Sequence, residues 1–395
     1  MNTVITSQKL IRKHARRSIF NALWTHLPIL YSIYTILTSC MMAMQYFVPS
    51  RPQLLLSAGF PLLWVLLYVY ASVSSEGKQR NRRAAWMIAG SVTGGAIVIL
   101  LLLSRFLVPV VTNNLVMPVT DYFPESIVSQ TSILTDTEGN KLRDVNGVEL
   151  TEGALVTMTD GRVLRLEGSV LVDAAQKSKL IGFYEMMNVV WLVLLVLHCR
   201  RFRGWQGVIR FFVAALLYGF ILESGGVLSH FFTENDYHVY FPFFAAPMVT
   251  MLGWPMVFYC VSYIWDILAK HWIKLQKINS LRAALFISMI ALCWDLNVDP
   301  VATGLGLWTW NARLPAWFFG VPLVNFTSWF SAVFAFGVGY TVITRSRVSE
   351  KKKTAAMFAV IPLLLLAAAV INFGICGIAE GFGGPAWTVM MQFWK

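Results

Sequence analysis

Residues 293–311 read CWDLNVDPVATGLGLWTWN and place two aspartates, Asp295 and Asp299, four residues apart in an otherwise apolar segment. This spacing puts both carboxyls on the same face of a helix. Ionisable groups at membrane depth are unfavourable, and neighbouring like charges are more so. The pair therefore indicates a functional site in a membrane helix. We expect Pro300, with Gly304 and Gly306, to break or bend this helix. A simple helix-end cap beside Pro300 is the alternative.

The chain as a whole has the composition of a polytopic membrane protein. Of its 395 residues, 57% are hydrophobic and 13% are charged, whereas about 25% are charged in a typical soluble domain. Mean hydropathy is +0.61. The five cysteines lie far apart and include no CxxC pair, so neither a disulfide framework nor a zinc site is expected.

Nine apolar stretches are long enough to cross a bilayer, which takes about 20 residues. They lie near residues 21–48, 53–74, 84–112, 180–199, 205–230, 243–267, 283–307, 319–343 and 355–378. A basic run at residues 9–17 leads straight into the first stretch without a cleavage site, which favours a retained helix over a signal peptide. The sequence predicts an all-α polytopic membrane protein with about nine transmembrane helices.

Lysine and arginine concentrate in alternate loops. The clusters lie at residues 9–17, 78–83, 200–203, 270–282 and 345–353. Because cytoplasmic loops are rich in Lys and Arg, we expect a cell-membrane protein with a cytoplasmic N-terminus and an extracytoplasmic C-terminus. The net charge of +12 then reflects topology. No nucleic acid is expected as a partner, because binding one would need a basic face on a soluble element.

One segment, residues 114–178, is polar and carries ten acidic residues against five Lys and Arg. Turn signals alternate there with short Val-, Leu- and Thr-rich runs, a pattern typical of β-hairpins. We expect a small β-rich extracytoplasmic insert that acts as a lid, a docking surface or a plain loop elaboration. It separates an N-terminal membrane region of three helices, residues 1–113, from a C-terminal region of six, residues 179–395, that carries the expected site.

Several predicted helices bring polar residues to a similar depth. With the topology above, Asp295, Asp299, Glu223, Asn325 and Glu185 all lie in the outer part of their spans. Random placement would scatter polar residues through both leaflets. Their common depth makes Glu223 and Asn325 the expected neighbours of the aspartate pair.

Motifs between residues 219 and 329 then point to a family. They are Glu223 with Gly226, a loop bearing Tyr237 and Tyr240, LGWP at 252–255, DLNVDP at 295–300 with Trp308 and Trp310, and FGVPLVNFTSW at 319–329. In this order the motifs resemble those of the integral-membrane carotenoid hydratases, the family of bisanhydrobacterioruberin hydratase and the carotenoid 1',2'-hydratase. The first 110 residues and the β-rich insert have no counterpart in that resemblance.

The resemblance implies hydration of the terminal C1–C2 double bond of an acyclic carotenoid end group, without a cofactor. The alkene is protonated to a tertiary carbocation, which water captures, so a strong acid in a dry site is required. Burial and a neighbouring carboxylate would keep one acid of a pair protonated. Asp295 and Asp299 are therefore the candidate catalytic pair, and one of them or Glu223 would orient and deprotonate the water.

Aromatic side chains are the candidate substrate-binding groups, because their faces stabilise cations. They are Trp294, Trp308, Trp310, Trp329, Tyr237 and Tyr240. Asn325 could hold water or a carboxyl group. For each of these residues, helix packing or a place at the membrane interface is the alternative. The expected partners are a lipophilic polyene such as lycopene, water and the lipid bilayer. Other enzymes of the carotenoid pathway are a further candidate class of partner.

Two other classes remain as alternatives. A membrane prenyltransferase binds diphosphate through magnesium and would need two aspartate-rich motifs facing the cytoplasm, whereas this chain has one, on the predicted outer side. A proton-coupled transporter would also use intramembrane acids and a broken helix, although no internal repeat is visible. The absence of HxxH and HxxxH boxes argues against a metal site.

Overall fold

The structure is a computed structural model. It describes residues 24–46, 59, 61–71, pieces of strand and turn between 116 and 173, and residues 174–393 apart from 235, 242 and 272–277. The predicted span at 84–112 and the basic clusters at 9–17 and 78–83 lie outside the described residues.

Helices make up most of the described chain. They are α2 (Leu27–Tyr46), α6 (Ala174–Val208), the π-helical turn η2 (Ile209–Ala214), α7 (Ala215–Leu228), α8 (Met248–His271), α10 (Ser280–Gly304), α11 (Leu323–Arg345), α12 (Glu350–Ala359), α13 (Ile361–Glu380) and α14 (Pro385–Phe393). Among the described residues, five helical stretches are long and apolar enough to cross a membrane. They correspond to the last six predicted spans, because 180–199 and 205–230 join into one stretch. The total of nine spans stays a prediction.

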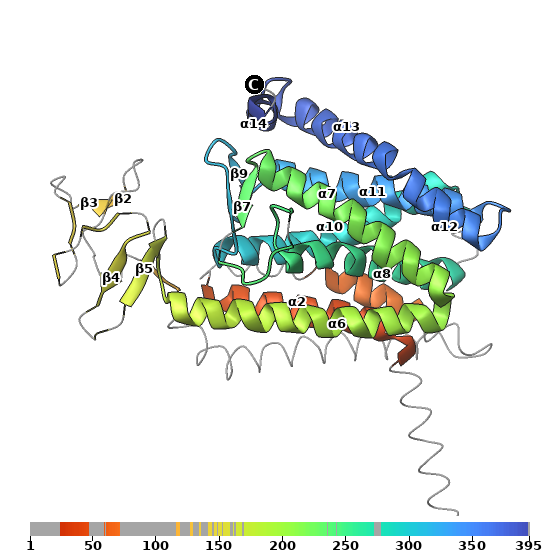
Figure 1. The fold of residues 1–395 in the computed structure, drawn as a ribbon, viewed down its shortest axis with the longest axis horizontal. Coiled ribbons are helices and arrows are strands. Elements are labelled where there is room, and N and C mark those ends of the chain that lie inside the picture. Colours follow the sequence, from red (N-terminus) through yellow and green to blue (C-terminus); the bar gives the residue numbers. More distant parts are fainter. Residues whose placement is uncertain are drawn as a thin grey trace, which may run out of the picture.

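The joined stretch bends at Gly204. Its φ of 66° and ψ of −177° interrupt α6, a conformation that glycine adopts at little steric cost. Figure 1 shows α6 beside α2 along one side of the bundle, while α7 returns on another side. The stretch therefore contains two helical segments, one on each side of Gly204, which correspond to the predicted spans at 180–199 and 205–230.

Helix α10 holds the aspartate pair and packs closely against α11. Its N-terminus is capped by Asn279, whose Oδ1 accepts a hydrogen bond from the Arg282 N–H at 2.9 Å. The helix continues through Pro300 and ends at Gly304, so the break predicted for Pro300 with the following glycines falls at Gly304. Proline is tolerated inside a membrane helix where neighbouring groups satisfy the freed carbonyl. The aspartates consequently share one uninterrupted helical face.

The acidic segment forms short strands. An antiparallel sheet has the order β1 (Val116–Pro118), β6 (Val170–Val172), β5 (Val163–Glu167), β4 (Leu155–Thr157), and β2 (Ile127–Val128) pairs with β3 (Leu134–Thr135). Within β5 the side chains alternate, with Leu164 and Leu166 fully buried and Val163 exposed. Figure 1 shows these strands beyond the N-terminal end of α6.

An ion cluster joins the sheet to the loop that precedes α8. Arg165 of β5 donates to both carboxylate oxygens of Asp236, at 3.1 and 2.5 Å, and Lys177 Nζ lies 2.9 Å from the same carboxylate. Burial alone would raise the pKa of Asp236, but the hydrogen bonds from Arg165 and Lys177 outweigh burial and lower it. A charged Asp236 therefore stabilises this contact.

We expect acid to loosen the contact between the sheet and this loop. Because the folded pKa of Asp236 is depressed, its stabilisation is present above the unfolded value of about 3.9 and is lost as the pH falls through the lower folded value. Asp236→Asn should reproduce the loosening at pH 7. Hydrogen exchange of residues 230–240 measures this loosening. The loss of protection should be seen both at low pH and in Asp236→Asn at pH 7.

The control for this prediction is Glu149→Gln. Glu149 pairs with Lys141 and Arg143 inside the insert, so its loss should leave exchange at residues 230–240 unchanged. Equal exchange in wild type and Asp236→Asn would show that the ion cluster does not hold the loop.

Basic residues from separate segments gather at the other end of the bundle. Arg203 pairs with Asp266 at 2.5 Å, Arg210 with Glu350 at 2.7 Å, and Arg345 donates to the Ile278 carbonyl at 2.9 Å. The C-terminal ends of α6 and α8 meet α12 there (Figure 1). The bundle therefore has one strongly basic end, opposite the β-rich insert.

Candidate functional site

A cavity of about 1240 Å³ lies among α2, α6, α7, α8, α10, α11 and α13. It is larger than the roughly 300–1,000 Å³ of common ligand pockets. Most of its lining is aliphatic or aromatic, and its acidic lining groups are Glu223, Asp295 and Asp299. A cavity of this size and character suits a long apolar molecule that needs polar chemistry at one point.

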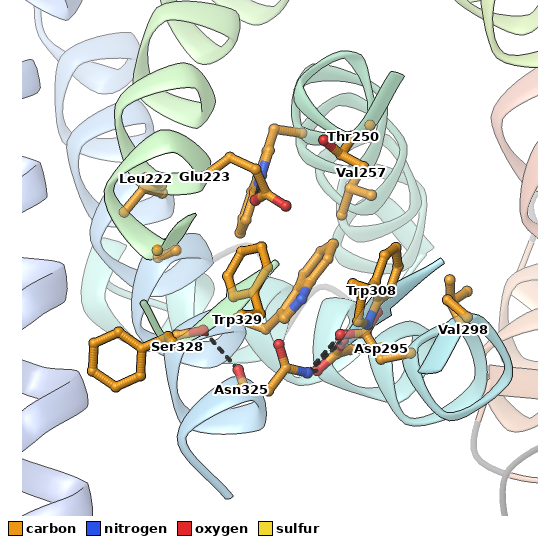
Figure 2. Close-up of a pocket in the computed structure, with 18 of the residues that line it drawn as sticks. Leu222, Glu223, Thr250, Val257, Asp295, Val298, Trp308, Asn325, Ser328 and Trp329 are labelled. Atoms are coloured by element: carbon orange, nitrogen blue, oxygen red, sulfur yellow. Dashed lines mark hydrogen bonds between the residues drawn. The ribbon is translucent and has the colours of Figure 1, made fainter. Parts of the chain in front are cut away.

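The aspartate pair and Asn325 form the polar centre of this cavity. Asp295 and Asp299 are 1% and 3% exposed, and Asn325 on α11 is 7% exposed. The Asn325 Nδ2 donates to Asp299 Oδ2 at 2.6 Å and lies 3.3 Å from both carboxyl oxygens of Asp295. Figure 2 shows the Asn325 amide directed at the Asp295 carboxyl. One amide thus contacts both buried carboxyls.

Glu223 lines the same cavity from α7. Its Oε2 accepts a hydrogen bond of 2.7 Å from Trp254 Nε1 on α8, and its charge is close enough to interact with Asp299. Figure 2 shows Glu223 across the cavity from Asp295 and Asn325, with Trp329 between them in this view. The three predicted catalytic carboxyls therefore share one cavity.

Trp254 takes its place because α7 and α8 approach closely at Gly219. A Cβ at Gly219 would lie 2.5 Å from the Trp254 Cβ, so a glycine is needed there. The Trp254 ring stacks on Trp329 with centroids 4.5 Å apart and an interplanar angle of 21°. This aromatic pair lies directly beside the Glu223 carboxyl.

The other predicted tryptophans also line the cavity. Trp294 lies edge-on to Tyr31, with centroids 6.0 Å apart. Trp308 and Trp310 belong to strand β8 (Trp308–Trp310), which pairs with β7 (Phe232–Glu234). The Trp310 Nε1 donates to Thr303 Oγ1 at 3.0 Å. A second short pair, β9 (Ala316–Phe318) with β10 (Val321–Pro322), precedes α11.

Tyr237 and Tyr240 do not line the cavity. Tyr240 is 42% exposed, and its hydroxyl donates to the Glu234 carbonyl at 3.0 Å. Tyr237 is buried in an apolar cluster that also contains Ile181 and Val301. Both tyrosines therefore shape the loop between β7 and α8 rather than the cavity surface.

Glu185 also lies apart from the aspartate pair. Its carboxylate accepts from the backbone N–H of His238 at 3.0 Å and that of Val239 at 3.2 Å, and lies 2.9 Å from the His238 Nδ1. Glu185 thus anchors the loop that carries Tyr237 and Tyr240, and it is absent from the cavity lining.

Sequence reasoning missed Trp254 and the contribution of the first helix. Trp254 lies in the LGWP motif, and a tryptophan next to a proline inside a span was an available signal. Tyr31 and Tyr34 of α2 line the cavity beside Trp191 of α6. No motif marks the two tyrosines, because their proximity to the site arises only from helix packing.

No metal-binding cluster is present in the described part of the chain, where no group of three or more His, Cys, Asp or Glu residues could hold an ion. The site described above can hold a proton between buried carboxyls, orient a small polar molecule with an amide, and surround an apolar molecule with aromatic faces.

The fold and site define a helical protein with membrane-spanning helices around a large apolar cavity. Residues 183–392, more than half of the chain, match the model of a family described as carotenoid biosynthesis protein. The chain belongs to this family, and its role is in carotenoid metabolism. No curated protein and no solved structure matches the chain.

Proposed function

We propose that this protein is a carotenoid hydratase that adds water to the terminal C1–C2 double bond of an acyclic carotenoid end group. The observation that carries the proposal is the contact of one Asn325 amide with two buried carboxyls on one helical face. Two carboxyls so placed favour a state with one shared proton, since like charges repel strongly when desolvated.

The two aspartates take different roles in the proposed reaction. Asp299 accepts the shorter hydrogen bond, 2.6 Å against 3.3 Å for Asp295, and charge-assisted bonds are the shorter ones. Asp299 is therefore the carboxylate and Asp295 the proton donor. Asp295 transfers its proton to the less substituted alkene carbon, which leaves a tertiary carbocation on the neighbouring carbon.

Water then captures the carbocation. The oxygen forms the new C–O bond, and the water gives up one proton to a carboxylate, either Asp299 or Glu223. Return of a proton to Asp295 completes the cycle, so the net change is the addition of one water without any redox step. Trp254 orients Glu223 for this role through its Nε1–H.

Aromatic faces would protect the carbocation before water arrives. The stacked pair Trp254 and Trp329 lies next to Glu223. Trp294, which precedes Asp295 in the sequence, also lines the cavity. Their π-systems attract positive charge and offer no nucleophilic oxygen. The apolar remainder of the cavity would hold the polyene chain.

The proposed orientation follows from the distribution of charge. The basic end of the bundle, with Arg203, Arg210 and Arg345, would face the cytoplasm. The β-rich insert, residues 114–178, would then be extracytoplasmic, together with the end of the cavity that β7 and β8 form.

Expression of the full chain in a lycopene-producing host tests the function. We expect carotenoids whose mass exceeds that of lycopene by one water for each reacted end. Unchanged lycopene in cells that contain the membrane-inserted protein would contradict the proposal. Prenylated products with release of diphosphate would favour a prenyltransferase, and proton-dependent uptake into vesicles would favour a transporter.

A further inference from the structure

A group of buried polar atoms beside the cavity has no part in the mechanism above. Both carboxyl oxygens of Glu234, the Tyr237 hydroxyl and the Trp308 Nε1 are buried, and none of them has a hydrogen-bond partner among the described residues. Glu234 is 7% exposed and Tyr237 is 6% exposed. Buried polar groups almost always have a partner, in the protein or in ordered water.

The β7–β8 pairing brings the Glu234 and Trp308 side chains together. Glu234 lies directly opposite Trp308 across the two strands, and side chains directly opposite each other project from the same face of a strand pair. On that face the next pair, Phe232 and Trp310, also lines the cavity. Tyr237 belongs to the cluster of side chains that packs against Trp308.

Thr250 does not donate a hydrogen bond to the Glu234 carboxyl. Although its side chain lies beside that carboxyl, its one hydroxyl hydrogen is donated to the Pro247 carbonyl at 3.0 Å. Burial, and next the charge of Glu223, raise the pKa of Glu234 well above its usual range. The raised pKa favours the protonated carboxyl, which can both donate and accept a hydrogen bond.

We propose that Glu234, Tyr237 and Trp308 bind ordered water at the edge of the cavity. The Trp308 N–H and the Tyr237 hydroxyl donate, and the Glu234 carboxyl accepts, which meets the two to four hydrogen bonds of a buried water. Because Trp308 and Thr250 line the cavity, this water borders the polyene site. Its use as the reactant of hydration rests on the proposed function, whereas the water site itself does not.

Radiolytic hydroxyl-radical labelling of the full chain in lipid nanodiscs tests the water site, because bound water allows labelling of buried side chains. Tyr237 should be labelled clearly faster than Tyr218, which is fully buried and donates to the Ala332 carbonyl at 3.1 Å. In Glu234→Leu the Tyr237 label should fall several-fold, and Glu234→Gln should retain it. Labelling of wild-type Tyr237 no faster than Tyr218 would overturn the proposal.

Thermal stability provides a second measurement. If the Glu234 carboxyl were dry, its replacement by leucine would remove an unsatisfied polar group and stabilise the protein. With bound water, Glu234→Leu should be less stable than wild type, and Glu234→Gln should lie close to wild type. A stabilised Glu234→Leu variant contradicts the water site.

The carotenoid assay separates this inference from the proposed function. In the lycopene-producing host, Glu234→Leu should lower the yield of hydrated product several-fold, and Glu234→Gln should lower it less. If Tyr237 is labelled as expected but wild type yields no hydrated product, the hydratase proposal fails and the water site stands. If wild type is active and Glu234→Leu is equally active, the water does not supply the reaction.

Discussion

Asp295→Asn and Asp299→Asn should each reduce carotenoid hydration by about 10²- to 10⁴-fold, the usual contribution of a general acid or base. The first change removes the proposed proton donor. The second removes the carboxylate that shares the Asn325 amide with it. Because asparagine has nearly the same shape, both variants should remain folded and membrane-inserted. Hydrated product per unit of inserted protein, measured by mass in the lycopene-producing host, checks the prediction.

Asp266→Asn is the matched control for these two variants. It makes the same chemical change on α8, where Asp266 is 58% exposed and pairs with Arg203 at the basic end of the bundle. Its hydration should equal that of wild type. Full activity in both Asp295→Asn and Asp299→Asn would contradict the assignment of the pair as acid and base.

Asn325→Leu should also lose most hydration, and it should in addition destabilise the protein by about 1–3 kcal/mol. Leucine has a similar volume but no N–H, so both buried carboxyls lose the donor that they share. In the proposed mechanism the proton is then no longer localised on Asp295, and the two aspartates lose their relative orientation. Product yield together with the thermal midpoint in nanodiscs measures both effects.

Ser331→Ala is the control on the same helix. Ser331 is fully buried, but its hydroxyl donates to the Thr327 carbonyl of its own helix and it does not line the cavity. We expect wild-type hydration and only a small loss of stability. If Asn325→Leu were as active and as stable as Ser331→Ala, the shared amide would have no role in the reaction.

Much of the fold was predictable because helical spans depend on local composition. Apolar runs at 243–267, 283–307 and 319–343 anticipate α8, α10 and α11 to within a few residues, since a membrane helix needs about 20 apolar residues in sequence. The break or bend predicted for Pro300 with the following glycines corresponds to the end of α10 at Gly304. The exact residue could not be predicted, because tolerance of a proline depends on the groups packed around it.

The part of the candidate site formed by intramembrane polar residues was predictable, because residue type and topology indicate the depth of such residues in the membrane. Glu223, Asp295, Asp299 and Asn325 were chosen as intramembrane polar groups, and the structure brings all four to one cavity. The loop tyrosines Tyr237 and Tyr240 were chosen from a motif, which says nothing about the direction of a side chain in an irregular loop. They lie outside the cavity lining.

The sequence by itself determined the polytopic membrane composition, the approximate helix boundaries and the aspartates one turn apart, because these depend on local order along the chain. Only the tertiary structure decided that Asn325 contacts both aspartates and that Trp254 holds Glu223, contacts that span 26 to 31 residues. Such contacts depend on how the side chains of neighbouring helices interlock. The close packing of α7 against α8 at Gly219 is one example.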